Sequence, residues 1–430
     1  MNSLLKKLED NRTAILLAEI GAYLHLLGRF SEEFIKSQAK DATNTNSNFD
    51  YKNVCNVSSF FENTGLEVLL KSADWEPLIN ITLSGLNELS TNKVNNFCEF
   101  IEKHTWSDNP QGLLKILADA HGIASGVDKA LAGRGHSGKQ RKAYNFKATV
   151  FGYEKEIGLL KATDLDNVNK DYIKRVKEEF FKEIKRILDN ILQNKSVSYE
   201  NYTDFINTIK EYFSKTIGET RRSINEISLY DYAHTIASLT KSNLAKMILD
   251  GWYEPRGKSQ WRILKINLSI IELLSKGLKI RDIFGYRQEI ENVLDEIKKT
   301  LEFHYPLGNE IYRDSTGIYF SCPGIEDKDA LKTEIISELK SLNQLDFSLQ
   351  IEISDKSRSM VILASEREES LKEISYPHIS FGNIKEESIS SQKDGDKELC
   401  PVCRIRLKSL KIERCKKCEA RYQERAHNWI

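Results

Sequence analysis

Four cysteines near the end of the sequence form its most specific chemical pattern. They stand as two C-x-x-C pairs, Cys400-Pro-Val-Cys403 and Cys415-Lys-Lys-Cys418, with eleven residues between the pairs. Each pair can turn tightly enough to aim two thiolates at one ion, and two such turns complete a tetrahedral four-sulfur site. Because such a site leaves no position open for water, the pattern predicts a structural Zn²⁺. The alternative, a redox-active Cys-Pro-Val-Cys pair, lacks the βαβ unit that usually surrounds one.

Basic residues surround the predicted zinc site. Residues 400–430 carry nine Lys or Arg and three Glu, a net charge of +6. This is an electrostatic footprint for RNA or DNA, and the candidate nucleic-acid contacts are Arg404, Arg406, Lys408 and Lys411. An earlier loop has four cations and no acid, and it is a second candidate for phosphate contacts: Arg134, Lys139, Arg141 and Lys142. In both places the alternative is that the charges only solvate a surface.

The elements that position these residues are of two kinds. Residues 12–40, 170–192 and 202–213 have apolar side chains at three- and four-residue spacing, so the first 250 residues predict a helical domain. The stretch from Trp261 to Ser365 predicts the order β-α-β-β-α-β, which is the ferredoxin-like plan. Its expected parts are a strand at Trp261–Asn267, a helix near 290–301, a hairpin turning at Asp314-Ser-Thr-Gly317, a helix near 331–342, and strands at Phe347–Ile353 and Met360–Ala364.

The predicted fold class is therefore α+β and multidomain. We expect a helical domain over 1–250, a ferredoxin-like domain over 251–384, a polar linker over 385–398 and a four-cysteine module over 399–430. A ferredoxin-like sheet serves many unrelated functions, so the fold by itself decides none of them.

Composition excludes several classes of protein. The sequence has 63 basic and 63 acidic residues in 430, so nucleic acid or membrane can be attracted only by local patches. No apolar run approaches the ~20 residues of a transmembrane helix, and the N-terminus, which carries acids and no cleavage site, is not a signal peptide. Cysteines clustered at one end suit a reducing cytoplasm and a metal site better than a disulfide framework.

Three segments carry a resemblance to a known family. The strings Trp261–Asn267, Tyr305–Asp314 and Gly317–Phe320 resemble the first palm domain of the large subunit of type III CRISPR effector complexes, with the closest likeness to a divergent, Csx-type branch. The segment Leu113–Lys129 is similar to another part of that subunit, with Asp119, Ser125, Gly126 and Lys129 in matching places. The segment beginning Ser228-Leu-Tyr-Asp231 looks like the closing helix of the family's permuted HD domain.

The resemblance implies an HD-like domain over residues 1–250, whose ligands in active members hold metal ions that activate water. This sequence has Leu26 after His25 where the family has an adjacent His-Asp pair, and Tyr232 where it has a histidine. Losing a carboxylate and an imidazole would remove most of the metal affinity, so we expect a scaffold without nuclease activity. The vestigial ligand candidates are His25, Asp119, His121 and Asp231. Each can equally hydrogen-bond its own helix or turn.

The resemblance also implies what a whole large subunit contains. Such subunits continue into a second palm, where active members carry a Gly-Gly-Asp-Asp turn that cyclises ATP into oligoadenylate. This sequence has no Gly-Gly-Asp-Asp and stops at Ile430. We therefore expect it to correspond to the N-terminal part only, as a split, truncated or interaction-only member that makes no messenger by itself.

Three functions follow as hypotheses. The first is an architectural subunit in antiviral defence that assembles with guide RNA, other effector subunits and possibly a second palm-containing polypeptide. The second is a live HD-type nuclease for single-stranded DNA that uses the four vestigial ligands. The third is a stand-alone zinc-ribbon protein that binds nucleic acid without a partner.

Overall fold

The described residues fall into two separate units, each with its own core. The computed structural model describes residues 3–30, 65–80, 94–104, 110–131, 170–214, 228–251, 259–342, 349–359, 361–374, 398–409 and 411–423. The helical unit comprises Lys7–Trp261 and Pro306–Gly308. The sheet unit comprises Met1–Lys6, Arg262–Tyr305 and Asn309–Ile430.

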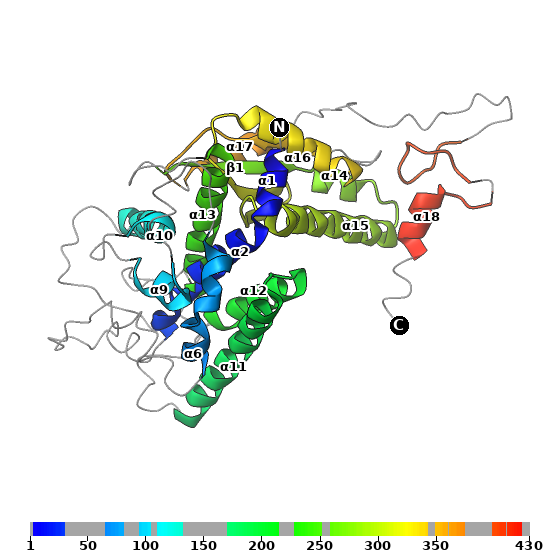
Figure 1. Ribbon diagram of the computed structural model, residues 1–430. Coiled ribbons are helices and arrows are strands. Elements are labelled where there is room, and N and C mark those ends of the chain that lie inside the picture. Colours follow the sequence, from blue (N-terminus) through cyan, green and yellow to red (C-terminus); the bar gives the residue numbers. More distant parts are fainter. Residues whose placement is uncertain are drawn as a thin grey trace. The chain divides into compact units, whose positions relative to one another are not determined.

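Three long helices form the centre of the helical unit. Helix α2 (Arg12–Leu24) follows α1 (Leu4–Asp10), and every residue from Ala14 to Leu24 is buried because almost all of them are apolar. Helix α2 packs on α13 (Leu229–Asp250), which also packs on α10 (Gly112–Leu131) (Figure 1). The short helices η1 (Leu27–Phe30), α6 (Leu66–Leu70), η2 (Ala73–Trp75), α7 (Glu76–Ile79) and α9 (Phe97–Glu102) complete this part.

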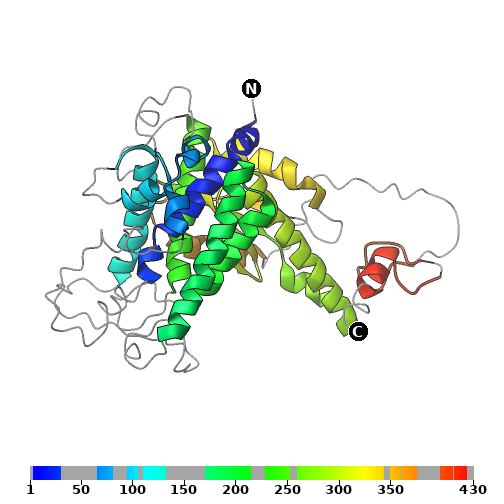
Figure 2. The same cartoon turned by 60° about the horizontal axis from the view of Figure 1, so that its bottom comes forward.

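Helices α11 (Lys170–Asn194) and α12 (Tyr199–Phe213) lie side by side (Figure 2). The apolar stripe predicted for α11 is buried where its side chains are described, at Phe180, Ile184, Ile187 and Ile191. Burial of such a stripe is what stabilises an amphipathic helix of this length.

A charged pair lies inside the helical unit. Lys241 of α13 and Glu19 of α2 are both fully buried, with 2.8 Å between Nζ and Oε2. Tyr202 of α12 donates its hydroxyl hydrogen bond to Glu19 at 3.1 Å and accepts one from Lys241 at 3.2 Å. The ion pair and its hydrogen bonds therefore connect α2, α12 and α13 inside the unit.

The sheet unit is built on four strands in the spatial order β2-β3-β1-β4. Strand β1 (Trp261–Asn267) pairs antiparallel with β4 (Gln350–Ile353), and β2 (Glu310–Asp314) pairs antiparallel with β3 (Gly317–Pro323). The hairpin turns at the predicted place. Gly317 has a φ of 143°, and a Cβ there would lie 2.2 Å from the carbonyl oxygen of Ile266, so only glycine fits.

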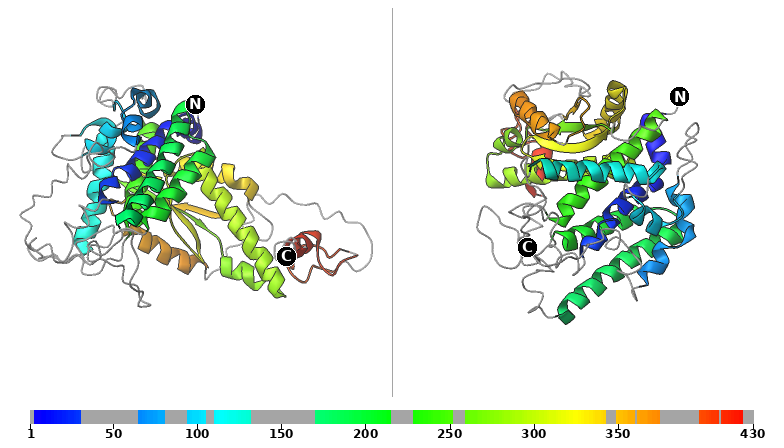
Figure 3. Two further views of the ribbon diagram at one scale, coloured as in Figure 1. Left: turned by 90° about the horizontal axis from the view of Figure 1, so that it is seen from below. Right: turned by 90° about the vertical axis from the view of Figure 1, so that its left-hand side faces the viewer.

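Helices cover both faces of this sheet (Figure 3). On one side lie α15 (Ile280–Lys298), which follows α14 (Ile270–Ser275) and runs into a π-helical segment at Lys299–His304, and α16 (Lys328–Glu338), which runs into η5 (Leu339–Leu342). On the other side lies α17 (Ile362–Ile374). The element order β-α-β-β-α-β expected from the sequence is present, with α14 and α17 as additions.

One predicted strand is wrong. Residues Met360–Ala364 were expected to form the last strand, but Ile362 begins α17. The short apolar run there suggested a strand, whereas the following Ser-Glu-Arg-Glu-Glu-Ser-Leu-Lys-Glu is rich in good helix formers and extends the helix through it. The proposed linker 385–398 lies outside the described residues except for Glu398. Among the described residues, no helix is long and apolar enough to cross a membrane.

Candidate metal centres

The four cysteines come from a short hairpin and the start of a helix. Leu399 and Leu407 form an antiparallel bridge that closes the loop holding Cys400 and Cys403. Arg404, directly after the second cysteine, has a left-handed φ of 57° that turns the chain back. Cys415 immediately precedes α18 (Lys416–Gln423), and Cys418 lies in its first turn.

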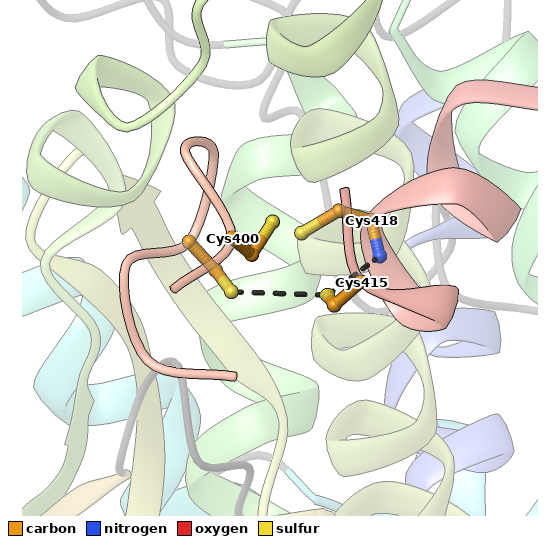
Figure 4. A group of neighbouring side chains, drawn as sticks. Cys400, Cys415 and Cys418 are labelled. Carbon is orange, nitrogen blue, oxygen red and sulfur yellow. Dashed lines mark hydrogen bonds between the residues drawn. The ribbon is translucent and has the colours of Figure 1, made fainter. Parts of the chain in front are cut away.

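The geometry of the four sulfurs fits a tetrahedral metal site. All four lie within 4.8 Å of one another, and the cysteines are buried. Figure 4 shows the side chains of Cys400, Cys415 and Cys418 converging on one place. The Sγ atoms of Cys403 and Cys415 are 3.8 Å apart. Sulfurs placed about 2.3 Å from zinc at the corners of a tetrahedron are about 3.8 Å apart, so the predicted donor set is assembled.

Backbone N–H groups and neighbouring thiols shape the electrostatics of this site. Burial raises the pKa of the Cys400 thiol, but hydrogen bonds from the backbone around Cys415, Cys403 and Val402 outweigh it and hold that pKa at about 7. Burial raises the pKa of Cys418, and the other cysteines raise it further. A divalent cation would remove this penalty because it binds the thiolate forms and displaces their protons.

Ion pairs attach the four-cysteine segment to α15. Arg414 pairs with the buried carboxylate of Asp282 at 2.6 Å. Glu289 accepts from both Arg421 and Lys417, the latter at 3.1 Å. Burial raises the pKa of Glu289, but its two cationic partners, Arg421 first, lower it below its ordinary value. Three of the cations that give the segment its positive charge are therefore engaged in ion pairs with α15.

Close packing accompanies these ion pairs. A Cβ at Gly285 would lie 2.6 Å from the carbonyl oxygen of Arg421, so the backbones of α15 and α18 approach as closely as glycine allows. The Arg421 guanidinium lies 4.4 Å above the ring of Tyr286, which belongs to the same buried cluster as the cysteines. Leu274 of α14 packs against that cluster.

The predicted nucleic-acid contacts are only partly described. Arg404, Lys408 and Lys411 are exposed, and Arg406 is half-buried. Lys408 pairs with Glu398 at 3.1 Å. The other predicted basic loop, Arg134, Lys139, Arg141 and Lys142, lies outside the described residues.

A second candidate metal centre lies in the helical unit and consists of three histidines. His25, His104 and His121 each place one ring nitrogen within 4.8 Å of the others. They come from three separate places in the sequence: the end of α2, the end of α9 and the middle of α10. The ring centroids are 4.8 to 5.4 Å apart.

Hydrogen bonds fix the protonation of two of these rings. Nδ1 of His25 bonds the carbonyl oxygen of Ala22, and Nδ1 of His104 bonds that of Ile101 at 2.6 Å. Because a carbonyl only accepts, both Nδ1 atoms carry the proton, and in the neutral rings both Nε2 atoms are acceptors. Histidines that bind metals usually donate their other ring N–H to a backbone carbonyl or a carboxylate, which orients the ring.

Burial and neighbouring groups favour the neutral form of His25. Burial lowers the pKa of His25 well below its ordinary value, and the neighbouring His104 and His121 lower it further. Nε2 of His25 lies 2.9 Å from Nδ1 of His121. Imidazole nitrogens suit zinc, copper, nickel or iron, and a site of three histidines would leave a position for water.

The remaining vestigial candidates are not part of this cluster. Asp231 caps α13, since its carboxylate accepts from the backbone N–H and hydroxyl of Ser228 at 3.1 and 2.7 Å. Asp119 accepts from the hydroxyl of Ser259 at 3.2 Å. Of the predicted HD candidates, the structure therefore brings together His25 and His121 only.

The residues that replace the expected ligands do lie at the cluster. Leu26 is buried directly after His25, and the ring of Tyr232 meets that of His121 edge-on at 6.1 Å. Arg29 lies 4.5 Å above the Tyr232 ring. His104 was not predicted. Its only signal in the sequence is a histidine at the end of a short helix, which is too common to single it out.

The fold is similar to that of solved structures. No family model and no curated protein matches the sequence. A chain of the Csm1–Csm4 cassette in complex with cA3 matches 84% of this chain with a TM-score of 0.50 at 12% identity. The cassette in complex with one ATP matches 84% with a TM-score of 0.50 at 13% identity.

Those matches cover 48% of the solved chains, so this sequence spans about half of their length. The matched subunit, Csm1, is the large subunit of type III CRISPR complexes. At the level of fold, the resemblance to that large subunit predicted from the sequence is confirmed.

Proposed function

We propose that this protein is an architectural, large-subunit-like component of a type III CRISPR effector complex. The observation that carries the proposal is the similarity of fold to Csm1 over 84% of the chain. Within it, the helical unit takes the place of the HD-like domain. The four strands in the order β2-β3-β1-β4 take that of the ferredoxin-like palm.

The architectural role rests on the residues of the helical unit. Leu26 and Tyr232 occupy places where the related HD domains have ligands, and Asp231 is engaged as a helix cap. The solved relatives are cassettes with Csm4. We propose by analogy that this chain acts in the cytoplasm with other effector subunits, a guide RNA and a palm-containing partner polypeptide.

Purification of the tagged protein from its own host tests this function. The expected result is co-elution with other effector subunits and with RNA of the uniform length of processed guides. Elution of the protein alone, from cells that express the rest of the complex, would overturn the proposal.

We propose further that the four cysteines hold one structural Zn²⁺. The S–S spacing and the N–H groups directed at the sulfurs support this assignment. Metal analysis should find bound zinc, and Cys415→Ser should lower the zinc content by one ion per chain. The control is Cys322→Ser, a buried cysteine outside the cluster, which should keep the metal.

A second function is favoured by the three histidines. If they hold a transition metal, its open position would activate water, and the unit would be a metal-dependent nuclease. Cleavage of single-stranded DNA stimulated by Mn²⁺ or Ni²⁺, abolished by His25→Ala or His104→Ala, would establish it. His234→Ala is the matched control, since His234 pairs with Tyr23 and lies outside the cluster. Absence of cleavage with every metal would leave the architectural role.

A further inference from the structure

Exposed aliphatic side chains gather in one part of the sheet unit. Thirteen large apolar residues are exposed among the described residues, and seven of them belong to two short segments, 271–283 and 399–407. We call these seven the aliphatic face: Ile271, Leu278, Ile280, Ile283, Leu399, Ile405 and Leu407. Ile271 and Ile280 are 67% and 71% exposed, which is unusual for such side chains.

The two segments of the aliphatic face are neighbours. Leu274, one helical turn after Ile271, packs against the cysteine cluster that Leu399 and Leu407 flank. Leu399 and Leu407 are directly paired across the hairpin, so their side chains share one side of it. Arg281 of α15 lies 5.3 Å above the ring of Tyr422 in α18. The face is therefore carried by the elements to which the four-cysteine segment is attached.

The surroundings of this face are positively charged. Six cations in or beside its segments are exposed, compared with three exposed acids. The cations are Lys279, Arg281, Arg404, Lys408, Lys411 and Lys416, and the acids are Glu272, Glu398 and Glu413. Glu272 pairs with Lys276, and Glu398 pairs with Lys408, so that five of the six cations and one of the three acids remain outside these two pairs. An apolar centre within a basic rim has the composition of a protein-binding surface.

We propose that the aliphatic face docks a protein partner that presents an apolar centre bordered by Asp and Glu. The charge of the rim selects an acidic partner and opposes a second copy of this chain, because like rims would repel. RNA is disfavoured because single strands are held by exposed aromatic rings. The seven exposed residues are Ile and Leu, and the nearby Tyr422 is covered by Arg281 and Arg414. The proposal does not depend on the CRISPR assignment.

The test compares two variants of the full-length tagged protein, purified from its own host. Leu278→Asp/Ile280→Asp places two carboxylates in the face. Val68→Asp, at a 78% exposed valine in the helical unit, is the matched control. Zinc content and circular dichroism show that each variant is folded. Loss of two buried aliphatic contacts should lower recovery of the docked protein by about tenfold or more. The control should retain it.

Zero-length carbodiimide cross-linking identifies the side chains of the partner that lie against the aliphatic face. In the wild-type complex, Lys279 or Lys411 should be joined to Asp or Glu of the protein that the double variant loses. The proposal is overturned if the double variant retains every protein that the wild type carries. It is also overturned if the variant loses only RNA, or if the wild type is a dimer in light scattering and the double variant a monomer.

Discussion

Among single residues, the buried ion pair of Glu19 and Lys241 constrains the helical unit most. Both groups are fully buried and pair with each other, and Tyr202 hydrogen-bonds to both. A buried ion pair adds little net stability over apolar residues of the same size. Breaking it is costly, however, because a buried charge then loses its ion-pair partner.

Glu19→Ala is therefore expected to destabilise the helical unit by about 3–5 kcal/mol. The double variant Glu19→Leu/Lys241→Met removes both charges and should recover most of that loss. Urea unfolding, followed by circular dichroism, measures the two free energies. If the double variant were as unstable as the single one, lost packing and not the broken ion pair would be the cause.

At the scale of elements, ion pairs attach the β2–β3 hairpin to α15. Glu310 pairs with Lys298 at 3.0 Å and with Arg313 at 2.8 Å, and Arg313 also reaches Glu291 at 3.1 Å. Burial raises the pKa of Glu310, but Lys298 and Arg313 outweigh it, so the pKa lies below its ordinary value.

This lowered pKa predicts that the contribution of Glu310 to folding stability depends on pH. A carboxyl group with a lower pKa in the folded state stabilises fully above its unfolded pKa of about 4.3 and loses that effect as pH falls through the folded value. Glu310→Gln should therefore lower the free energy of unfolding by about 1–3 kcal/mol at pH 7 and by progressively less below pH 4. Denaturant unfolding of the wild type and the variant at pH 7 and below pH 4 measures this loss of stability. An equal loss under the two conditions would show that the charge of Glu310 does not contribute to stability.

The contact between α15 and α18 makes a second prediction at this scale. Gly285→Ala improves helix propensity by up to about 1 kcal/mol. Yet its Cβ would meet the Arg421 carbonyl oxygen. We expect α18 to be displaced and zinc to pass faster to a chelating dye. Gln288→Ala, on the exposed side of the same helix, is the control and should leave that rate unchanged. Equal rates in both variants would mean that docking does not hold the metal.

Considered as a whole, the molecule shows which features a sequence reveals. The cysteine pairs could be predicted because all four ligands lie within nineteen residues and local turns bring them together. Strand β1 and the hairpin at Gly317 were likewise local patterns. The histidine cluster depends on three helices that meet only after packing, so His104 carried no local signal. Asp231 matched a family position, yet its contact to Ser228 is a cap.

Two units with separate cores predict separable unfolding. The four proposed zinc ligands lie in the sheet unit, and the Glu19–Lys241 pair lies in the helical unit. Chelation of zinc should therefore increase hydrogen exchange in α15 and α18, because their contact is organised around the cysteine cluster. Glu19→Ala should increase exchange in α2, α12 and α13. Exchange monitored by mass spectrometry resolves these peptides. If either change increased exchange equally in both sets of helices, the units would unfold as one cooperative structure.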